Sequence, residues 1–346
     1  MSVRPIAYVM EQTLGSITHY LNLRRQEPMP ESGARTWIPI EYRQGRVPWT
    51  LTGSILARRA LGSVLEDVDG IFVHTTTLSL LSPDYYAKKP TVISSDGTPL
   101  NKRTMREGYG LRPEGRIAES AKRLLFRSLF SLARGFVAWS SWTKDSFVED
   151  YGCKEDDVVV IPPGIDLNQF KPGDRDHELP RILFVGGDFA RKGGDLLLKV
   201  FRDRLRGKAE LDIVTRTDLP EEPGIRVHHN IQANSDKLLG LYGSSDIFVV
   251  PTRADCYPLV CMEALAAGLP LVATRVGGIR DMVREGETGH LIDVDDAHVL
   301  GDVLVTLVDD PNLRHKMSVA CREDARNRFE VRTNAKRLFD FVRARC

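Results

Sequence analysis

The chain has 346 residues, which is too long for one ordinary hydrophobic core, so we expect two domains. Hydrophobic residues make up 42% and charged residues 27%, a composition typical of globular proteins rather than disordered ones. The 48 Lys and Arg nearly balance the 47 Asp and Glu, which argues against nucleic-acid binding through bulk positive charge.

Cysteine usage and hydropathy bear on where the protein works. The five cysteines are widely spaced and form no Cys-x-x-Cys pair, which is typical of a reducing compartment and of a chain without structural zinc. We find neither a secretory leader nor an apolar run long enough to span a membrane. We therefore expect a cytoplasmic protein, or one peripheral on the inner face of the membrane.

Short β-branched apolar runs alternate with helical patterns along the first half of the chain. The predicted strands are residues 6–10, 70–73, 90–94, 135–139 and 158–161. Strands this short and apolar, each followed by a helical segment, indicate a parallel sheet with crossover helices.

Two loops that follow these strands carry residues of interest. The first, residues 11–19, contains Gly15 and His19. We expect His19 to be a helix residue whose side chain is packed rather than one that binds a ligand. The second contains Asp96 directly before Gly97. Asp96 either caps a turn or offers its carboxylate to a ligand, and the sequence leaves both interpretations open.

A basic stretch covers residues 88–134, where eleven Lys and Arg stand against four Asp and Glu. One helical stripe in it is predicted to pack inward, namely Ile117, Ala121, Leu124, Leu125, Ser128, Leu132 and Ala133. Phe126 and Phe130 lie on another side, near Arg123 and Arg127. Exposed aromatic residues beside arginines would suit an anionic membrane surface or a lipid-phosphate acceptor. The alternative is that the phenylalanines are buried and the arginines merely solvated.

A linker rich in proline, glycine and charge separates the two halves, and we place the boundary near Pro172. The predicted domains are residues 1–172 and 173–331. The strand rhythm then restarts, and the predicted strands are residues 182–185, 211–214, 225–227, 247–250 and 270–273. Two doubly wound α/β domains would bind a ligand in a cleft at the carboxyl ends of their strands.

The turn after the first strand of the second half combines glycines with two adjacent cations. It reads Gly186-Gly187-Asp188-Phe189-Ala190-Arg191-Lys192-Gly193-Gly194 and precedes a predicted helix over residues 196–201. Glycines let backbone approach a ligand closely, and adjacent cations neutralise phosphates. The sequence predicts a phosphate-binding turn here, and the alternative is a solvated basic turn.

The most informative segment is residues 249–270, in which Asp255 and Glu263 stand eight positions apart. Asp255 lies on a loop, while a helix is predicted to begin near Pro258, to hold Glu263 and to end at Gly268. The N-terminus of that helix suits a diphosphate, and the carboxylates suit sugar and ribose hydroxyls. Two carboxylates alone would indicate only a surface Asp and a helix Glu, but the whole segment favours ligand binding.

This segment resembles the Glu-x7-Glu acidic pair of the retaining GT-B glycosyltransferases of family 4 (glycosyl transferases group 1), with Asp255 in place of the first Glu. The resemblance is specific over residues 135–300 and looser over residues 1–134. It implies the GT-B architecture, in which two Rossmann-like doubly wound domains face each other across a cleft. The first domain would take the acceptor and the second the nucleotide-sugar donor, with a last helix, residues 332–345, packing back on the first.

The resemblance implies roles for the matched residues. Arg191 and Lys192 would grip the donor diphosphate, Asp255 would hold the sugar ring and Glu263 the ribose. Many members carry an Arg where this chain has Gly187, and a His where it has Asp96. The expected catalytic residues are Arg191, Lys192, Asp255 and Asp96. The expected donor-binding residues are Gly15, Gly187, Arg191, Lys192, Thr215, Asn230, Asp255, Cys256, Tyr257, Pro258, Leu259, Val260 and Glu263.

The implied function is transfer of a hexose, with retention, from a nucleotide sugar (a UDP- or GDP-sugar first) to a hydroxyl acceptor in glycan, polysaccharide or glycolipid synthesis. We expect no metal and no other cofactor, because no Asp-x-Asp triplet suited to a nucleotide-bound Mg²⁺ is present. His228 and His229 are adjacent on a strand and diverge, which makes a poor metal site. Two alternatives stay open: a nucleotide-sugar epimerase or phosphorylase on the same scaffold, and a non-catalytic nucleotide-sugar binding protein.

Overall fold

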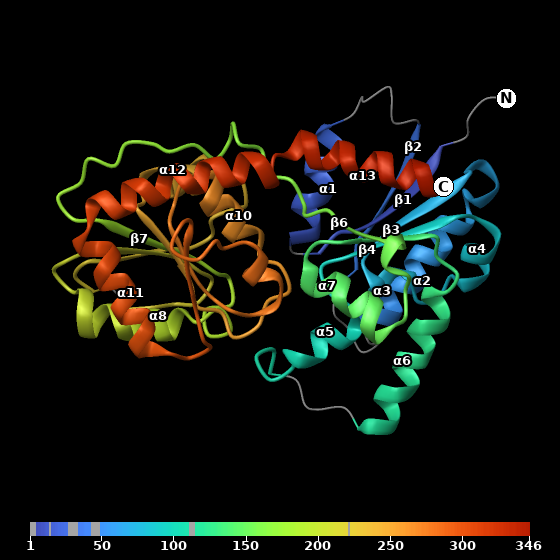
Figure 1. The fold of residues 1–346 in the computed structure, drawn as a ribbon, viewed down its shortest axis with the longest axis horizontal. Coiled ribbons are helices and arrows are strands. Elements are labelled where there is room, and N and C mark those ends of the chain that lie inside the picture. The colour runs from blue at the N-terminus through green and yellow to red at the C-terminus, as the bar shows by residue number, and fades with distance from the viewer. Residues whose placement is uncertain (1–4, 14, 27–33, 43–48, 111–114, 221) are drawn as a thin grey trace. The chain divides into compact units, whose positions relative to one another are not determined.

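The computed structural model describes residues 5–13, 15–26, 34–42, 49–110, 115–220 and 222–346 (Figure 1). The chain divides into two compact units. Unit 1 comprises Met1–Thr104, Arg112–Gly164 and Val331–Cys346, and unit 2 comprises Met105–Leu111 and Ile165–Glu330. Each unit is built on a six-stranded parallel sheet with helices on its faces. The predicted α/β class with two Rossmann-like domains is therefore confirmed.

Unit 1 contains strands β1 (Ile6–Glu11), β2 (Arg35–Ile40), β3 (Gly70–His74), β4 (Thr91–Ser95), β5 (Gly135–Ala138) and β6 (Val158–Val160). Its helices are α1 (Gly15–Arg25), α2 (Trp49–Gly62), α3 (Thr76–Ser79), α4 (Pro83–Lys88), α5 (Pro99–Thr104), α6 (Arg116–Phe130), α7 (Ser141–Asp145) and α13 (Val331–Arg345). The sheet order is β2-β1-β3-β4-β5-β6, and every neighbouring pair is parallel.

Alternate residues of the unit 1 strands feed two separate cores, as the pleat of a strand requires. Tyr8 and Phe72 point to the face covered by α1 and α13, where Phe339 packs against Tyr8 at a ring distance of 5.8 Å. Val9 and neighbouring residues point to the opposite face, which α2 and α6 cover. The last helix of the chain thus completes the core of unit 1 rather than that of unit 2.

Unit 2 contains strands β7 (Arg181–Val185), β8 (Glu210–Val214), β9 (Ile225–His228), β10 (Ile247–Val250), β11 (Leu271–Thr274) and β12 (Gly289–Ile292). Its helices are α8 (Gly194–Val200), α9 (Asp236–Ser244), α10 (Leu259–Ala266), α11 (Ala297–Asp309) and α12 (Pro311–Arg328). The sheet order is β12-β11-β10-β7-β8-β9. Short 3-10 segments (Leu65–Asp67, Glu155–Asp157, Gly277–Asp281) and π-helical turns (Ser146–Asp150, Phe201–Leu205) complete the two units.

Helix α6 is turned the opposite way from the prediction. Phe126 and Phe130 are buried, and Phe130 meets Tyr151 with a ring distance of 5.0 Å. Leu124 and Leu125 of the stripe predicted to pack inward are exposed instead. The prediction is wrong because the unit 1 core takes the two aromatic rings instead of the aliphatic stripe, and the alternative, that the phenylalanines are buried, is confirmed. Among the described residues, no helix is long and apolar enough to cross a bilayer.

Candidate functional site

The centre of the unit 2 sheet is the point where its strand order reverses. The chain continues from β7 toward β8 and β9, and from β10 toward β11 and β12, so the loops after β7 and β10 diverge. Such a point in a doubly wound sheet opens a crevice at the carboxyl ends of the strands, where ligands bind. The loop after β7 carries Arg191 and Lys192, and the loop after β10 carries Asp255.

Three of the predicted catalytic residues meet at this point. Lys192 Nζ forms an ion pair with Asp255 Oδ2, and Arg191 Nη1 lies 3.6 Å from the same oxygen. Arg191 also donates from Nη1 to the carbonyl oxygen of Ala254 at 2.6 Å and from Nε to Asp188 Oδ2 at 3.0 Å. All three side chains are largely buried. The arrangement sets two cations and one carboxylate around a single position at the switch point of the sheet.

Two glycines allow the loops to approach each other. Gly193 has φ of +74°, and a Cβ there would lie 2.0 Å from the carbonyl oxygen of Pro251. Gly277 has φ of +56°, and a Cβ there would lie 2.2 Å from the carbonyl oxygen of Asp255. Both positions need the conformational freedom of glycine. The place of Asp255 is therefore fixed by backbone packing on both sides of its loop.

Glu263 lies in helix α10, directly behind this cluster, and is only 6% exposed. Tyr242 of α9 donates a hydrogen bond from Oη to Glu263 Oε2 at 2.8 Å. Burial raises the pKa of Glu263 to about 7, against the opposing effects of the Tyr242 hydrogen bond and the charge of Lys192. Glu263 thus exchanges its proton near neutral pH, and it responds to the charge of a residue in the predicted diphosphate site.

The residues between Asp255 and Glu263 that were predicted to bind the donor offer little side chain to a ligand. Cys256, Tyr257, Pro258 and Leu259 are buried, and Val260 is half-buried. No side chain caps helix α10 at Pro258. What this segment presents is therefore mainly backbone N–H at the first turn of the helix, the arrangement that suits an anion.

Arg216 fills the space beside Gly187. Its guanidinium atoms lie 3.0–3.3 Å from the position that a Cβ at Gly187 would occupy. Arg216 follows β8, the strand next to β7, and it was not among the residues predicted to bind the donor. The signal available was its place two residues after a predicted strand. The structure thus sets an exposed guanidinium where the side chain of residue 187 would begin.

Two of the residues predicted to bind the donor, Thr215 and Asn230, follow the neighbouring strands β8 and β9 of unit 2. Thr215 is buried, and its backbone N–H donates to the carbonyl oxygen of His228 at 3.2 Å. Asn230 is exposed and has a left-handed backbone, with φ of +57°. His228 itself is engaged by Asp212, with Nε2 2.7 Å from Oδ1. Within the described part of the chain, no group of three His, Cys, Asp or Glu residues is arranged to hold a metal ion.

Two further residues were missed because their partners lie far away in sequence. Tyr242 is one, since nothing local marks its hydroxyl as the partner of Glu263. Tyr109 is the other: the guanidinium of Arg191 lies over its ring, 5.1 Å from the centroid. A cation over an aromatic face is held electrostatically, so Tyr109 helps to orient Arg191.

The other two predicted site residues belong to unit 1. Gly15 is the first residue of α1 and is exposed. Asp96 follows β4, where its Oδ1 forms an ion pair with Lys102 Nζ at 3.1 Å. Its backbone carbonyl accepts a hydrogen bond from Thr143 Oγ1 at 2.8 Å. Unit 2 alone therefore brings together Arg191, Lys192 and Asp255, and it does so without these two residues.

A buried aromatic cluster lies at the carboxyl ends of the unit 1 strands. The rings of His19, His74 and Trp139 are each 5.0 Å from the other two. Both histidines are buried, and both nitrogens of His19 and Nε2 of His74 lack a hydrogen-bond partner among the described residues. Burial lowers the pKa of His74 to about 3 and that of His19 well below its usual value. The cluster is therefore built for neutral histidines.

We expect this cluster to make the protein sensitive to acid. An unfolded histidine binds a proton near pH 6.5 and folded His74 only near pH 3, so the unfolded state gains stability as the pH falls below 6.5. The loss from His74 alone is about 2 kcal/mol at pH 5. In His74→Phe, the free energy of unfolding should fall less between pH 7 and pH 5 than in the unsubstituted chain. Exposed His298→Gln serves as the control, and an equal fall in all three proteins would contradict the prediction.

Both halves of the chain are similar to known protein families. The family model of the Glycosyl transferases group 1 matches residues 166–324, and that of Glycosyltransferase Family 4 matches residues 20–169. A D-inositol 3-phosphate glycosyltransferase of Corynebacterium diphtheriae is 31% identical over 246 residues, which are 62% of this chain and 58% of the relative. One of Catenulispora acidiphila is 30% identical over 255 residues, or 64% and 59%. The match therefore spans less than two thirds of these relatives.

Solved structures share the fold over the whole chain. A glycosyltransferase from Rickettsia africae has a TM-score of 0.75 at 15% identity and covers 99% of both chains. HepE of Anabaena, solved in complex with UDP, has a TM-score of 0.74 at 15% identity and covers 98% of this chain and all of its own. With both family models matched in succession and the same two-domain fold, this chain belongs to the glycosyl transferases group 1, the GT-B glycosyltransferases of family 4.

Proposed function

We propose that this chain transfers a hexose from a nucleotide-sugar donor to a hydroxyl acceptor, with retention at the anomeric carbon and without a metal ion. The observation that carries the proposal is the meeting of Arg191 and Lys192 with Asp255 at the switch point of unit 2. The cations match a diphosphate, and the carboxylate matches sugar hydroxyls. Glu263, buried behind them, is the acceptor for the ribose hydroxyls.

The reaction follows from where charge develops. As the bond between the anomeric carbon and the diphosphate oxygen breaks, negative charge grows on that oxygen. Arg191, Lys192 and the N-terminus of α10 stabilise it, which is electrostatic catalysis by groups already in place. The acceptor oxygen bonds to the anomeric carbon on the same face, and the departing diphosphate takes its proton. Asp255 is paired with Lys192 and Glu263 is buried beside Tyr242, so neither is a free nucleophile and no covalent intermediate is proposed.

The donor and acceptor classes are proposed from chemistry and from the relatives. UDP- and GDP-sugars come first as donors, and HepE was solved with UDP. The acceptor is a hydroxyl compound of glycan, polysaccharide or glycolipid synthesis, lipid-linked acceptors included. D-inositol 3-phosphate belongs in the acceptor panel because the curated relatives are named for it. Peripheral contact with the inner face of a membrane is a separate proposal, because its evidence lies in helix α6.

Thermal stabilisation by UDP-, GDP-, ADP- and dTDP-sugars tests the donor proposal. One nucleotide class should raise the melting temperature, because a ligand present at 100 times its Kd stabilises the folded state by about 2.7 kcal/mol. The rise should be equal with and without Mg²⁺, since the proposed reaction uses no metal ion. Arg216→Ala should reduce the shift, since its guanidinium lies beside Gly187. Arg275→Ala, at another exposed arginine, should leave it unchanged.

Each other outcome points to a different function. A shift that requires Mg²⁺ contradicts the metal-independent proposal, and no shift with any donor contradicts donor binding. Turnover of the donor without an acceptor indicates an epimerase, and release of a sugar phosphate with inorganic phosphate indicates a phosphorylase. Donor binding without transfer to any acceptor in the panel indicates a nucleotide-sugar binding protein.

A further inference from the structure

The outward face of helix α6 is apolar, the reverse of an ordinary surface helix. At helical spacing this face carries Ile117, Ala121, Leu124, Leu125 and Ser128, with no charged residue among them. Ile117 is 88% exposed, Leu124 67% and Leu125 53%, and the first two are the most exposed large apolar side chains among the described residues. We refer to Ile117, Leu124 and Leu125 as the α6 ridge.

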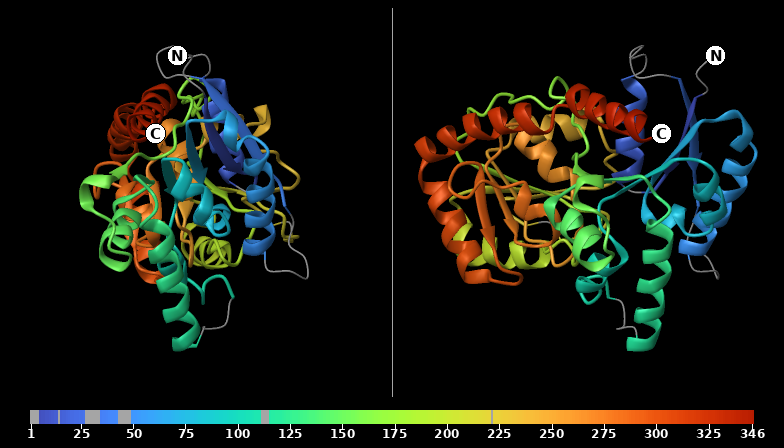
Figure 2. Two further views of the ribbon diagram at one scale, coloured as in Figure 1. Left: turned by 90° about the vertical axis from the view of Figure 1, so that its right-hand side faces the viewer. Right: turned by 45° about the vertical axis from the view of Figure 1, so that its right-hand side comes forward.

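The ridge cannot be folded into the core by turning the helix. Phe126, Leu129 and Phe130 fix the opposite side of α6 in the unit 1 core, and Phe130 contacts Phe136 and Phe147 at ring distances of 5.6 and 5.3 Å. Figures 1 and 2 show α6, in teal, extending away from the unit 1 sheet with its N-terminal end beyond the other elements of that unit. The ridge is thus held outward on a projecting, anchored helix.

Positive charge borders the ridge. Arg123 and Arg127 are exposed along one flank of α6, and Lys122 is exposed along the other. Glu119 is the acidic residue of the helix, and an ion pair with Arg103 of α5 neutralises it. The basic excess is therefore on the same projecting element as the exposed apolar side chains.

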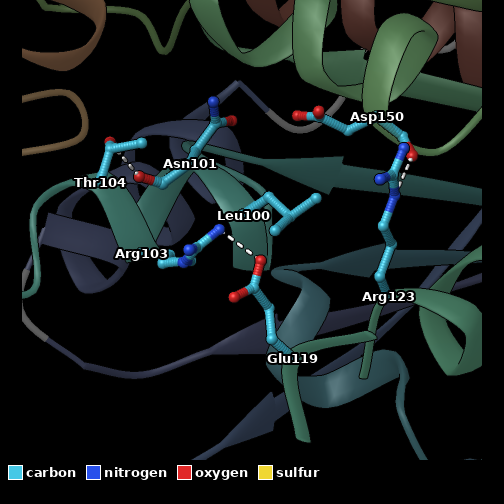
Figure 3. Close-up of a pocket in the computed structure, with 7 residues that line it drawn as sticks. All are labelled: Leu100, Asn101, Arg103, Thr104, Glu119, Arg123 and Asp150. Atoms are coloured by element: carbon cyan, nitrogen blue, oxygen red, sulfur yellow. Dashed lines mark hydrogen bonds and ion pairs between the residues drawn. The ribbon is translucent and has the colours of Figure 1, made fainter. Parts of the chain in front are cut away.

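A pocket of about 220 Å³ adjoins this flank, between α5 and α6. Arg103 and Arg123 both line it, together with Glu119 and Asp150. Figure 3 shows Arg103 pointing toward Glu119 and Arg123 pointing toward Asp150, whose carbonyl oxygen accepts from Arg123 Nε at 3.0 Å. The pocket thus holds two guanidinium groups beside the basic flank.

We propose that α6 docks the chain on an anionic lipid surface, with the α6 ridge entering the acyl boundary and Arg123 and Arg127 contacting lipid phosphates. An apolar strip bordered by cations fits the headgroup boundary of an anionic bilayer, where both parts are favoured together. A second copy fits less well, because a two-fold contact through this face would bring the basic flanks of both copies together. The contact uses the aliphatic ridge and not Phe126 and Phe130, which are buried.

Co-sedimentation with vesicles tests this proposal. The chain should bind vesicles of phosphatidylcholine mixed with phosphatidylglycerol but not phosphatidylcholine alone, and added salt should weaken the binding. The double substitution Leu124→Ser/Leu125→Ser should lower the partition coefficient at least tenfold. Arg127→Gln should lower it about fivefold. Val319→Ser, at a 57% exposed position on α12, is the matched control and should bind as the unsubstituted chain does.

Two kinds of result would overturn the docking. One is a failure to bind anionic vesicles, or equal binding to neutral and anionic vesicles. The other is vesicle binding that is unchanged by the double substitution, in a variant whose melting temperature is also unchanged. An oligomer that the double substitution converts to a monomer, without vesicle binding, assigns the ridge to a second copy instead. The assay contains neither donor nor acceptor, so its failure would leave the glycosyltransferase proposal standing.

Discussion

Replacement of Lys192 by methionine is expected to lower kcat by about 10²–10³-fold, the usual cost of removing one group that stabilises developing charge. The ammonium of Lys192 meets the carboxylate of Asp255 at the switch point, where the diphosphate leaves in the proposed reaction. Methionine keeps the apolar stem of the side chain. Arg191 Nη1, 3.6 Å from Asp255 Oδ2, still partners that carboxylate. The melting temperature should therefore change little.

The comparison that isolates the effect uses Lys199→Met, an exposed lysine on neighbouring helix α8. That variant should keep both activity and stability. Because the charge on the diphosphate grows as the bond breaks, kcat should fall by a larger factor than donor affinity. Parallel losses of activity and melting temperature would show that Lys192 serves the fold. A loss of donor affinity at unchanged kcat would limit it to binding the ground state.

The apolar runs predicted every strand inside the two sheets and two of the four edge strands, β6 and β9, and missed the other two. Interior strands such as Ile247–Val250 are buried on both faces and read as unbroken apolar runs. The missed strands, β2 and β12, are edge strands, and Pro39 in β2 and His290 in β12 interrupt their apolar character. An edge strand needs less burial and tolerates such residues, so hydropathy alone is weak evidence there.

In the candidate site, the residues that could be predicted are those that lie close together in the sequence. Arg191, Lys192, Asp255 and Glu263 stand in short motifs with a recognisable order of strand, loop and helix, and the structure brings the first three into contact. Tyr242 and Arg216 act through contacts made only in the folded sheet, so no local pattern announces them. The prediction of which face of α6 is buried was wrong for a related reason. The periodicity gave two apolar faces, and only the volume available in the core decided which one was buried.

Replacement of Glu263 by glutamine is expected to remove a loss of stability that appears as the pH rises. Burial raises the pKa of folded Glu263 to about 7 from the ordinary value of 4.5. Between these values the unfolded state has already released the proton while the folded state still holds it. Stability from this group is therefore complete below pH 4.5 and is lost as the pH rises through 7, by about 3 kcal/mol in total. Glu263→Gln should gain stability relative to the unsubstituted chain between pH 5 and pH 8, and exposed Glu323→Gln should not.

The same carboxyl couples donor binding to a proton. Ribose hydroxyls donate hydrogen bonds to a carboxylate and so favour its ionised form, which opposes the effect of burial on the pKa of Glu263. At pH 6, where the free protein holds this proton, binding of a UDP-sugar should release about one proton. Calorimetry in buffers of different ionisation enthalpy measures that number directly. Glu263→Gln should bind more weakly and release none. Proton release that persists in Glu263→Gln would show that the ribose binds elsewhere. The predicted pH dependence of stability is independent of that result, because it depends only on burial of the Glu263 carboxyl beside Tyr242.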